Sequence, residues 1–383
     1  MKLHAPELRV AIVGAGVIGA AIAYELSQLP AISITVLDQR SPQTYAATGA
    51  ALGVLVGAVS PKRRGQHLQL RLASLQRYET LIPELEARTG LELPYNRQGI
   101  LQLCFEPEQW QRWTEVSQCR REQGFHLEQL QPEQLAHHYP QVAQARSLQT
   151  PHPLLGAIYS PQDRQVNPIA LTEALIVAAQ HQGANFLWQT KVVDLIPQSQ
   201  GSNQRVSQIQ TATETLAVDW LILAAGLGSS DLTAQLQTPI ALQPVLGQAV
   251  KLRRPSPLTM PYPVVQGEDV HIVPLNAWEA WVGATVEFPA EQVVAKDFAL
   301  DADPQRLAAV LEQAIALCPD LKGADILQTW SGLRPRPQGR PAPIIEPLSG
   351  YRNVLLATGH YRNGILLAPI TALKIKEWIA ARP

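Results

Sequence analysis

Cysteine is scarce in this chain of 383 residues. The three cysteines, Cys104, Cys119 and Cys318, lie far apart, and none belongs to a CxxC pair. An odd, scattered set of cysteines predicts neither a disulfide framework nor a zinc site, and we expect no metal. It favours a reducing compartment, so the expected location is the cytoplasm.

Charge of one sign and long apolar runs are also missing. A formal net charge of −1 gives no overall attraction to nucleic acid or to an anionic membrane. No run of about 18 apolar residues occurs, and the start, MKLHAPELRVAIVGAG, lacks a signal-peptide core, so no integral membrane segment is expected. The hydrophobic fraction of 46% is typical of a globular protein, and the length favours two domains.

A glycine-rich turn stands near the start of the chain. Residues 9–38, RVAIVGAGVIGAAIAYELSQLPAISITVLD, read as a strand, a turn, a helix and a second strand. Gly14 permits the tight turn of a dinucleotide-binding unit, Gly16 lets a pyrophosphate approach the backbone, and Gly19 lets the helix pack on the strand. Asp38 ends the second strand, where a carboxylate can accept hydrogen bonds from a ribose diol. Ordinary turn glycines are the alternative, and the motif alone does not separate NAD from FAD.

Three later stretches have similar properties. Residues 44–60 (TYAATGAALGVLVGAVS) and 219–232 (DWLILAAGLGSSDL, with Gly226) are rich in small residues that let the backbone approach a ligand. A buried helix of small residues is the alternative for the first. Residues 354–369, VLLATGHYRNGILLAP, read as a strand, a polar turn and a helix. These stretches are widely separated, so we expect the nucleotide-binding domain to be built from discontinuous segments.

The predicted fold class is α/β, with a Rossmann-type nucleotide-binding domain and an inserted α+β domain of mainly antiparallel sheet. The nucleotide-binding domain is assigned to residues 1–88, 148–238 and 331–383, and the substrate-binding domain to residues 89–147 and 239–330. Periodicity predicts helices over 66–86, 107–124, 167–182 and 301–318, and a helix or loop over 128–148. It predicts strands over 184–194, 245–252, 270–275 and 279–286.

Seven motifs together carry a resemblance to a known family. They are VAIVGAGVIGAAIAYEL, TGAALGVL (48–55), LILAAGLGS (221–229), PVLGQ (244–248), IVP…VGAT (272–285), SGLRP (331–335) and TGHYRNGILLAP (358–369). The chain resembles the FAD-dependent D-amino-acid oxidase family, and within it the glycine oxidases of thiamine biosynthesis. The resemblance extends over nearly the whole chain, and it implies that the Rossmann-type domain binds FAD.

The resemblance also implies which residues hold FAD. In this family the GHYRNGI turn lies beside the flavin ring, and the following helix directs its amino-terminal dipole at the ring. The implied FAD-binding residues are Gly14, Gly16, Val17, Ile18, Gly19, Asp38, Gln39, Ala47, Thr48, Leu52, Gly53, Val54, Val192, Gly226, His360, Tyr361, Arg362, Asn363, Gly364, Ile365 and Leu366. Covalent attachment of the flavin needs a nearby cysteine, and Cys318 is not in an equivalent motif, so we expect non-covalent FAD.

Three residues are implied at the substrate. Arg334 in SGLRP matches the family arginine that grips the substrate carboxylate, as a planar guanidinium can do through two parallel hydrogen bonds. A structural salt bridge is the alternative, and Arg336 and Arg340 are nearby rivals. Arg362 is expected to reach the substrate side as well. His271 stands where glycine oxidases carry a tyrosine; it would donate a hydrogen bond and titrate near neutral pH, or it is a packed strand residue.

The implied activity is the oxidation of glycine or another small amino acid, such as sarcosine or a D-amino acid, to the imine or 2-oxo acid. Dioxygen would be reduced to hydrogen peroxide, and the imine would serve the thiazole moiety of thiamine. One alternative is a dehydrogenase of D-amino acids or proline that passes electrons to a quinone or protein acceptor. A second is a flavin-binding partner of a thiazole synthase with weak catalysis of its own. A thiazole synthase and further copies of the chain are possible partners.

Overall fold

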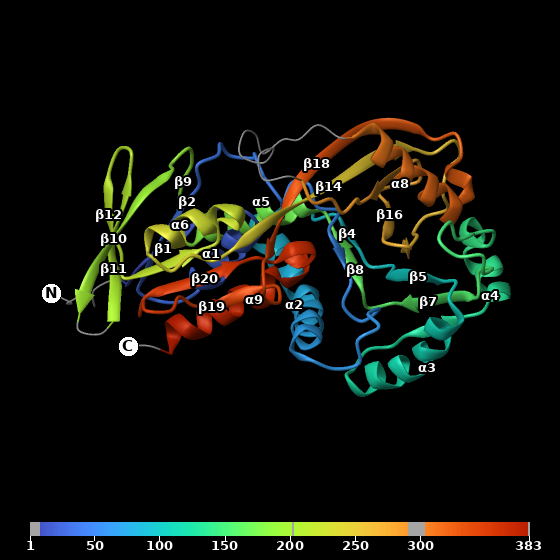
Figure 1. Cartoon of the computed structure of the whole chain (residues 1–383), viewed down its shortest axis with the longest axis horizontal. Coiled ribbons are helices and arrows are strands. Elements are labelled where there is room, and N and C mark those ends of the chain that lie inside the picture. Colours follow the sequence, from blue (N-terminus) through green and yellow to red (C-terminus); the bar gives the residue numbers. More distant parts are fainter. Residues whose placement is uncertain (1–7, 201–202, 290–302, 382–383) are drawn as a thin grey trace.

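The structure is a computed structural model that describes residues 8–200, 203–289 and 303–381. Two large sheets dominate it, one near each end of the long axis (Figure 1). The long strands β14 (Leu242–Arg253) and β18 (Asp325–Pro337) pair along their whole length and run between the two halves (Figure 1).

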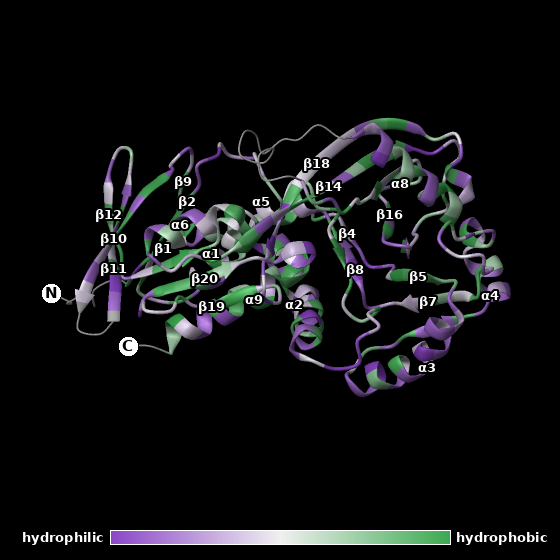
Figure 2. Cartoon of the chain, viewed as in Figure 1, coloured by the Kyte–Doolittle hydropathy of each residue, from purple (hydrophilic) through white to green (hydrophobic). Residues whose placement is uncertain are grey.

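The first sheet is a parallel Rossmann-type sheet, as the sequence predicts. Within the described part of the chain it has six strands in the order β19-β20-β13-β1-β2-β9, and only β19 runs antiparallel to its neighbour. Its strands are β1 (Leu8–Val13), β2 (Ile32–Leu37), β9 (Asn185–Leu187), β13 (Trp220–Leu223), β19 (Ile344–Pro347) and β20 (Val354–Thr358). Because helices cover the sheet, its central strands are continuously apolar, as the colouring of β20 shows (Figure 2).

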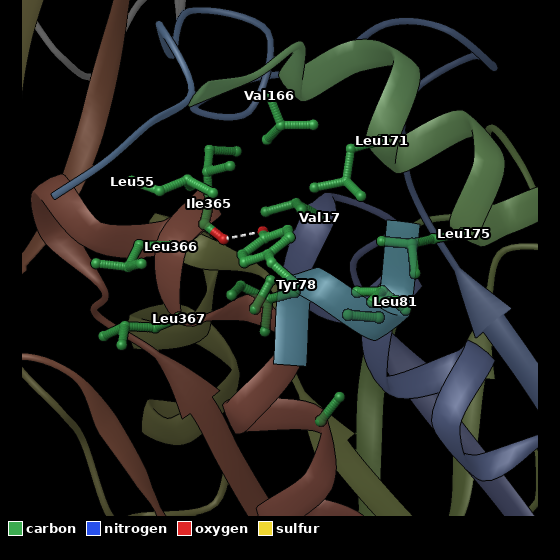
Figure 3. Close-up of a cluster of buried hydrophobic side chains, with 14 of the residues drawn as sticks. Val17, Leu55, Tyr78, Leu81, Val166, Leu171, Leu175, Ile365, Leu366 and Leu367 are labelled. Atoms are coloured by element: carbon green, nitrogen blue, oxygen red, sulfur yellow. Dashed lines mark hydrogen bonds between the residues drawn. The ribbon is translucent and has the colours of Figure 1, made fainter. Parts of the chain in front are cut away.

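Helices α1 (Val17–Leu26), α2 (Gln66–Thr89), α5 (Pro168–His181) and α9 (Gly364–Ala380) pack against one another beside this sheet. All ten residues of α1 are buried, because α5 and α9 both pack against it. Figure 3 shows the apolar cluster that joins these helices, where the Tyr78 hydroxyl of α2 donates to the carbonyl of Ile365 at the start of α9. The amino-terminal turn of α9 is therefore held in place by the core.

The expected strand over residues 184–194 is wrong in one respect. The segment forms two strands, β9 in the parallel sheet and β10 (Val192–Gln200) in a separate antiparallel sheet with β11 (Asn203–Thr211) and β12 (Thr215–Ala217). The break falls at Gln189, whose φ of 54° is left-handed. The polar residues Gln189, Thr190 and Lys191 separate the two strands, but a short polar stretch does not by itself reveal that the chain changes sheets.

The second sheet is mainly antiparallel. Its order among the described residues is β18-β14-β17-β16-β15-β5-β7-β6, and only β15 and β5 run parallel. The strands not yet given are β5 (Ile100–Cys104), β6 (Glu128–Leu130), β7 (Gly156–Ser160), β15 (Val264–Gly267), β16 (Val270–Pro274) and β17 (Glu279–Gly283). A further small sheet joins β3 (Val54–Leu55), β8 (Arg164–Val166) and β4 (Tyr95–Asn96).

The remaining helices are shorter or lie toward the margin. They are α3 (Pro107–Glu122), α4 (Pro132–His138), α6 (Ser229–Gln235) and α8 (Pro304–Leu317), with the 3-10 turns η1 (Pro140–Val142), η2 (Gly226–Gly228), η3 (Pro319–Leu321) and η4 (Tyr361–Asn363). Residues 128–148, expected as a helix or loop, therefore hold a strand, a short helix and a 3-10 turn. Helix α3 has mixed colouring, as expected of a surface helix (Figure 2).

Sheet membership differs from two of the predicted domain limits. Strand β7 lies within the segment 148–238 but pairs with β5 and β6 of the antiparallel sheet, and β18 crosses position 331 without a break. The division into two domains remains a proposal, with these strands assigned to the antiparallel half. No helix in the described residues is long and apolar enough to cross a membrane.

Candidate active site

A cavity of about 940 Å³ opens where the parallel strands of the first sheet end. Its walls come from the turn after β1, the end of β2, the loop before β3, the turn after β13 and the turn after β20. Strands β16 and β18 of the second sheet close its other side. This is the position at which open α/β sheets bind ligands, and the volume is at the upper end for ligand pockets.

The glycine turn after β1 is shaped for close backbone approach. Gly14 has a φ of 107°, and a Cβ there would lie 2.6 Å from the carbonyl oxygen of Ala224. A Cβ on Gly19 would overlap the carbonyl oxygen of Gly14, so helix α1 can approach β1 only with glycine at this position. Asp38 accepts the backbone N–H of Ala15 at 2.8 Å and thereby joins the end of β2 to the turn.

Two helix amino termini meet the cavity without acidic residues. The first turn of α1 contains no acid, and the Thr48 hydroxyl accepts the N–H of Val17 at 3.1 Å. Helix α9 also begins without a side-chain cap or an acid in its first turn. Two positive dipole ends directed at one cavity favour a ligand that carries negative charge at two places.

Most of the residues predicted to hold the cofactor line this cavity. They are Gly14, Gly16, Val17, Ile18, Asp38, Gln39, Ala47, Thr48, Leu52, Gly53, Val54, Val192, Gly226, His360, Tyr361, Arg362, Gly364 and Ile365. Gly19, Asn363 and Leu366 do not. Gly19 acts through packing, and the Leu366 side chain is buried in the apolar core. For Asn363 and Leu366 the expected contact with a cofactor has no support in the cavity lining.

The His360 imidazole is turned into the protein. Its Nε2 lies 3.0 Å from the Thr371 hydroxyl of α9, and burial lowers the pKa of His360 to about 3. The ring is therefore neutral near pH 7 and ties the turn to the helix. His360 therefore supports the cavity wall by anchoring the turn to α9.

Arg334 lies on β18 at the cavity, and most of its side chain is buried. Its Nη1 donates to the carbonyl oxygens of Thr285 at 3.0 Å and Leu246 at 3.3 Å. Among the residues that the structure describes, no carboxylate forms an ion pair with this guanidinium. Desolvation, and then the charge of Arg362, lower the pKa of Arg334 to about 10. Arg334 therefore remains charged at neutral pH. The alternative, a structural salt bridge, has no carboxylate partner for Arg334 among the described residues.

The other arginines have different surroundings. Arg362 also lines the cavity, and its Nη1 lies 3.3 Å from Oδ1 of the exposed Asp269. Arg336 is exposed and stacks over the rings of Phe288 and Tyr361. Arg340 forms a surface ion pair with Glu346. Neither Arg336 nor Arg340 lines the cavity; the arginines that do are Arg334 and Arg362, beside β16 and β18, and Arg40, in the loop after β2.

His271 lies on β16 and lines the cavity, but the expected titration near neutral pH is wrong for the free protein. Desolvation lowers the pKa of His271 to about 4, and the charges of Arg362 and Arg334 act in the same direction, against a smaller opposing effect of Asp269. The ring is therefore neutral at pH 7. It can offer one donor and one acceptor, but no charge.

Gly247 is a residue that the sequence reading left without a role. A Cβ at this position in β14 would lie 2.5 Å from Arg334 Nη1 and closer still to Cζ and Nη2. The guanidinium thus occupies the space of the missing side chain. A glycine in the middle of a strand is the signal that could have revealed it, because such glycines often mark a close approach.

The parallel sheet, the glycine turn and the two acid-free helix ends fit a dinucleotide, and this combination defines a dinucleotide-binding protein of the Rossmann type. Residues 9–378 match the model of the DAO family, described as FAD dependent oxidoreductase. The chain belongs to this family, and its cofactor is FAD.

Relatives agree with this assignment. The chain is 34% identical to the bifunctional protein ThiO/ThiG of Synechocystis sp. over 97% of its own length, but it spans only 51% of that relative. It is 29% identical to the glycine oxidase of Geobacillus kaustophilus, covering 97% of this chain and 92% of the relative. The crystal structure of glycine oxidase from Geobacillus kaustophilus superposes with a TM-score of 0.82, covering 98% of this chain and 96% of that one.

Proposed function

We propose that this protein is an FAD-dependent oxidase of small amino acids, with glycine as the principal substrate. The observation that carries the proposal is a largely buried guanidinium, that of Arg334, which faces the cofactor cavity without a described carboxylate partner. A buried cation of this kind is costly unless an anion arrives to pair with it, and an amino acid brings a carboxylate. Similarity to the Geobacillus kaustophilus glycine oxidase supports a small substrate.

The chain's own residues orient the substrate. Arg334 binds the carboxylate and fixes the position of the α-carbon, while its own position is set by the carbonyls of Thr285 and Leu246. Arg362 adds a second positive charge at the same end of the cavity. The glycine turn and the amino terminus of α1 would hold the pyrophosphate of FAD, and the amino terminus of α9 would favour negative charge on the flavin ring. Bound FAD supplies the two-electron acceptor for oxidation of the amine.

Anaerobic mixing of the purified holoenzyme with glycine, sarcosine, D-alanine, L-proline and acetate tests the proposed function. Glycine should bleach the flavin absorbance, and acetate, which has no amine, should not. In air, the enzyme should consume one dioxygen and form one hydrogen peroxide for each glycine that it converts to glyoxylate and ammonia. Bleaching without oxygen uptake would make the protein a dehydrogenase, and no bleaching by any amino acid would overturn the proposal.

The cofactor is proposed to be bound without a covalent link. No cysteine occurs among the described residues that line the cavity, and Cys318 lies in the core of the antiparallel half, where burial raises its pKa. Acid precipitation should therefore leave the yellow colour in the supernatant, with FAD released intact as judged by mass spectrometry. Flavin that stays with the precipitate would contradict this prediction.

A thiazole synthase is the proposed partner. Similarity to relatives named bifunctional protein ThiO/ThiG, of which the chain spans about half, supports this proposal. A cytoplasmic location is also proposed, because the three cysteines are free and scattered, as is typical of proteins in a reducing compartment. Co-purification with a tagged thiazole synthase tests the partner.

A further inference from the structure

Two polar side chains stand opposite each other beside the cavity. Gln266 on β15 is paired in register with His271 on β16. Residues paired in this way point to the same face of a sheet, with their Cβ atoms about 5 Å apart. The next strand, β5, places Gln102 opposite Gln266, so the three side chains form a row that leads away from the cavity.

Each of the two residues next to the cavity carries an unsatisfied atom. His271 Nδ1 and Gln266 Oε1 are both shielded from solvent, and neither has a hydrogen-bond partner among the residues that the structure describes. One of these atoms can carry a hydrogen and the other can accept it. Buried polar atoms are seldom left unpaired, and a rotation of the flexible Gln266 side chain is the simplest way to satisfy both.

The charges around His271 favour the same arrangement. Arg334 on β18 and Arg362 on η4 are the cations that act on the ring, and Asp269, in the turn between β15 and β16, is the anion. Because Nδ1 is shielded and the ring lines the cavity, Nε2 is the nitrogen that a ligand can meet. Two neighbouring cations at the cavity favour a lone pair on that nitrogen over an N–H.

We propose that Gln266 is a positioning residue that accepts a hydrogen bond from Nδ1–H of a neutral His271 and so leaves the Nε2 lone pair facing the cavity. There Nε2 accepts an N–H from the amino group of the substrate. His271 then recognises the amine, while the carboxylate is left to the arginines. The part that concerns the substrate rests on the proposed function; the assignment of the tautomer does not.

Nitrogen-15 NMR of histidine-labelled holoenzyme tests the tautomer directly. The chain has nine histidines, and the His271 signals are those missing from a His271→Asn sample. We expect a protonated Nδ1 and an unprotonated Nε2 in the wild type at pH 7. Gln266→Leu should shift the population toward Nε2–H, whereas Gln266→Glu, which keeps an acceptor oxygen, should retain Nδ1–H. Gln102→Leu is the matched control one strand further away and should leave the spectrum unchanged.

Kinetics separate the amine from the carboxylate. Gln266→Leu should raise KM for glycine by about 2- to 10-fold, the range expected for one neutral hydrogen bond, and should leave inhibition by acetate nearly unchanged. Nε2–H in the wild type, or an unaltered tautomer in Gln266→Leu, would overturn the proposal. A wild type that has Nδ1–H but does not oxidise glycine would contradict the proposed function alone.

Discussion

Arg334→Ala is expected to keep its FAD and to lose most of its activity toward glycine. The variant removes a charge-assisted contact in a desolvated site, which typically costs about 2–5 kcal/mol. At a factor of ten per ~1.4 kcal/mol, kcat/KM should fall by roughly 30-fold to several thousand-fold. The visible spectrum of the purified variant measures its flavin content, and initial rates of peroxide formation measure its activity.

Arg336→Ala and Arg340→Ala are the controls for this experiment. Arg336 is exposed over two aromatic rings, and Arg340 pairs with Glu346 at the surface, so each variant should change kcat/KM by about twofold at most. If Arg336→Ala were the more damaging change, the assignment of Arg334 to the substrate carboxylate would be wrong. Loss of flavin from Arg334→Ala would place this arginine in cofactor binding instead.

The dinucleotide-binding unit was predictable because its determinants are local. Gly14, Gly16 and Gly19 act within one turn and one helix, and Asp38 directly follows the next strand. The helices over 66–86, 107–124 and 167–182 were predicted to within a few residues, because apolar periodicity is local to each element, and Asn167 caps the third of them. The helix over 301–318 corresponds to α8, with residues 301–302 outside the described residues. Local sequence patterns were therefore sufficient to predict the dinucleotide-binding unit and the helices.

The environment of His271 was not predictable in the same way. His271 stands where glycine oxidases carry a tyrosine, and an isolated histidine side chain titrates near neutral pH. Its lowered pKa arises from burial in a sheet face and from Arg334 and Arg362, which are 63 and 91 residues away along the chain, as their numbers show. Burial and charge at one atom are set by tertiary contacts, which a single sequence does not encode in any short pattern.

Gly247 illustrates the same limit and leads to the second large effect. In Gly247→Ala, the new Cβ would come within 2.5 Å of Arg334 Nη1, whereas ordinary contact begins near 3.4 Å. The atoms it meets are the far end of a flexible side chain, so the strand can remain and the guanidinium must move by about 1 Å. A misplacement of this size can cost about 100-fold in rate. We therefore expect kcat/KM for glycine to fall by about 100-fold, with FAD content and melting temperature close to those of the wild type.

A double-mutant cycle shows whether Gly247 acts through Arg334 rather than through the fold. If the only consequence of the added methyl group is displacement of the guanidinium, Gly247→Ala should have almost no effect on kcat/KM when it is introduced into Arg334→Ala. The coupling free energy should then nearly equal the whole loss seen in the single Gly247→Ala variant. Two independent, additive losses would mean that the methyl group damages β14 itself, because the pairing of β14 with β18 is shared by both residues. In that case a lowered melting temperature should accompany Gly247→Ala in both backgrounds, and glycine at this position would serve the sheet rather than the substrate arginine.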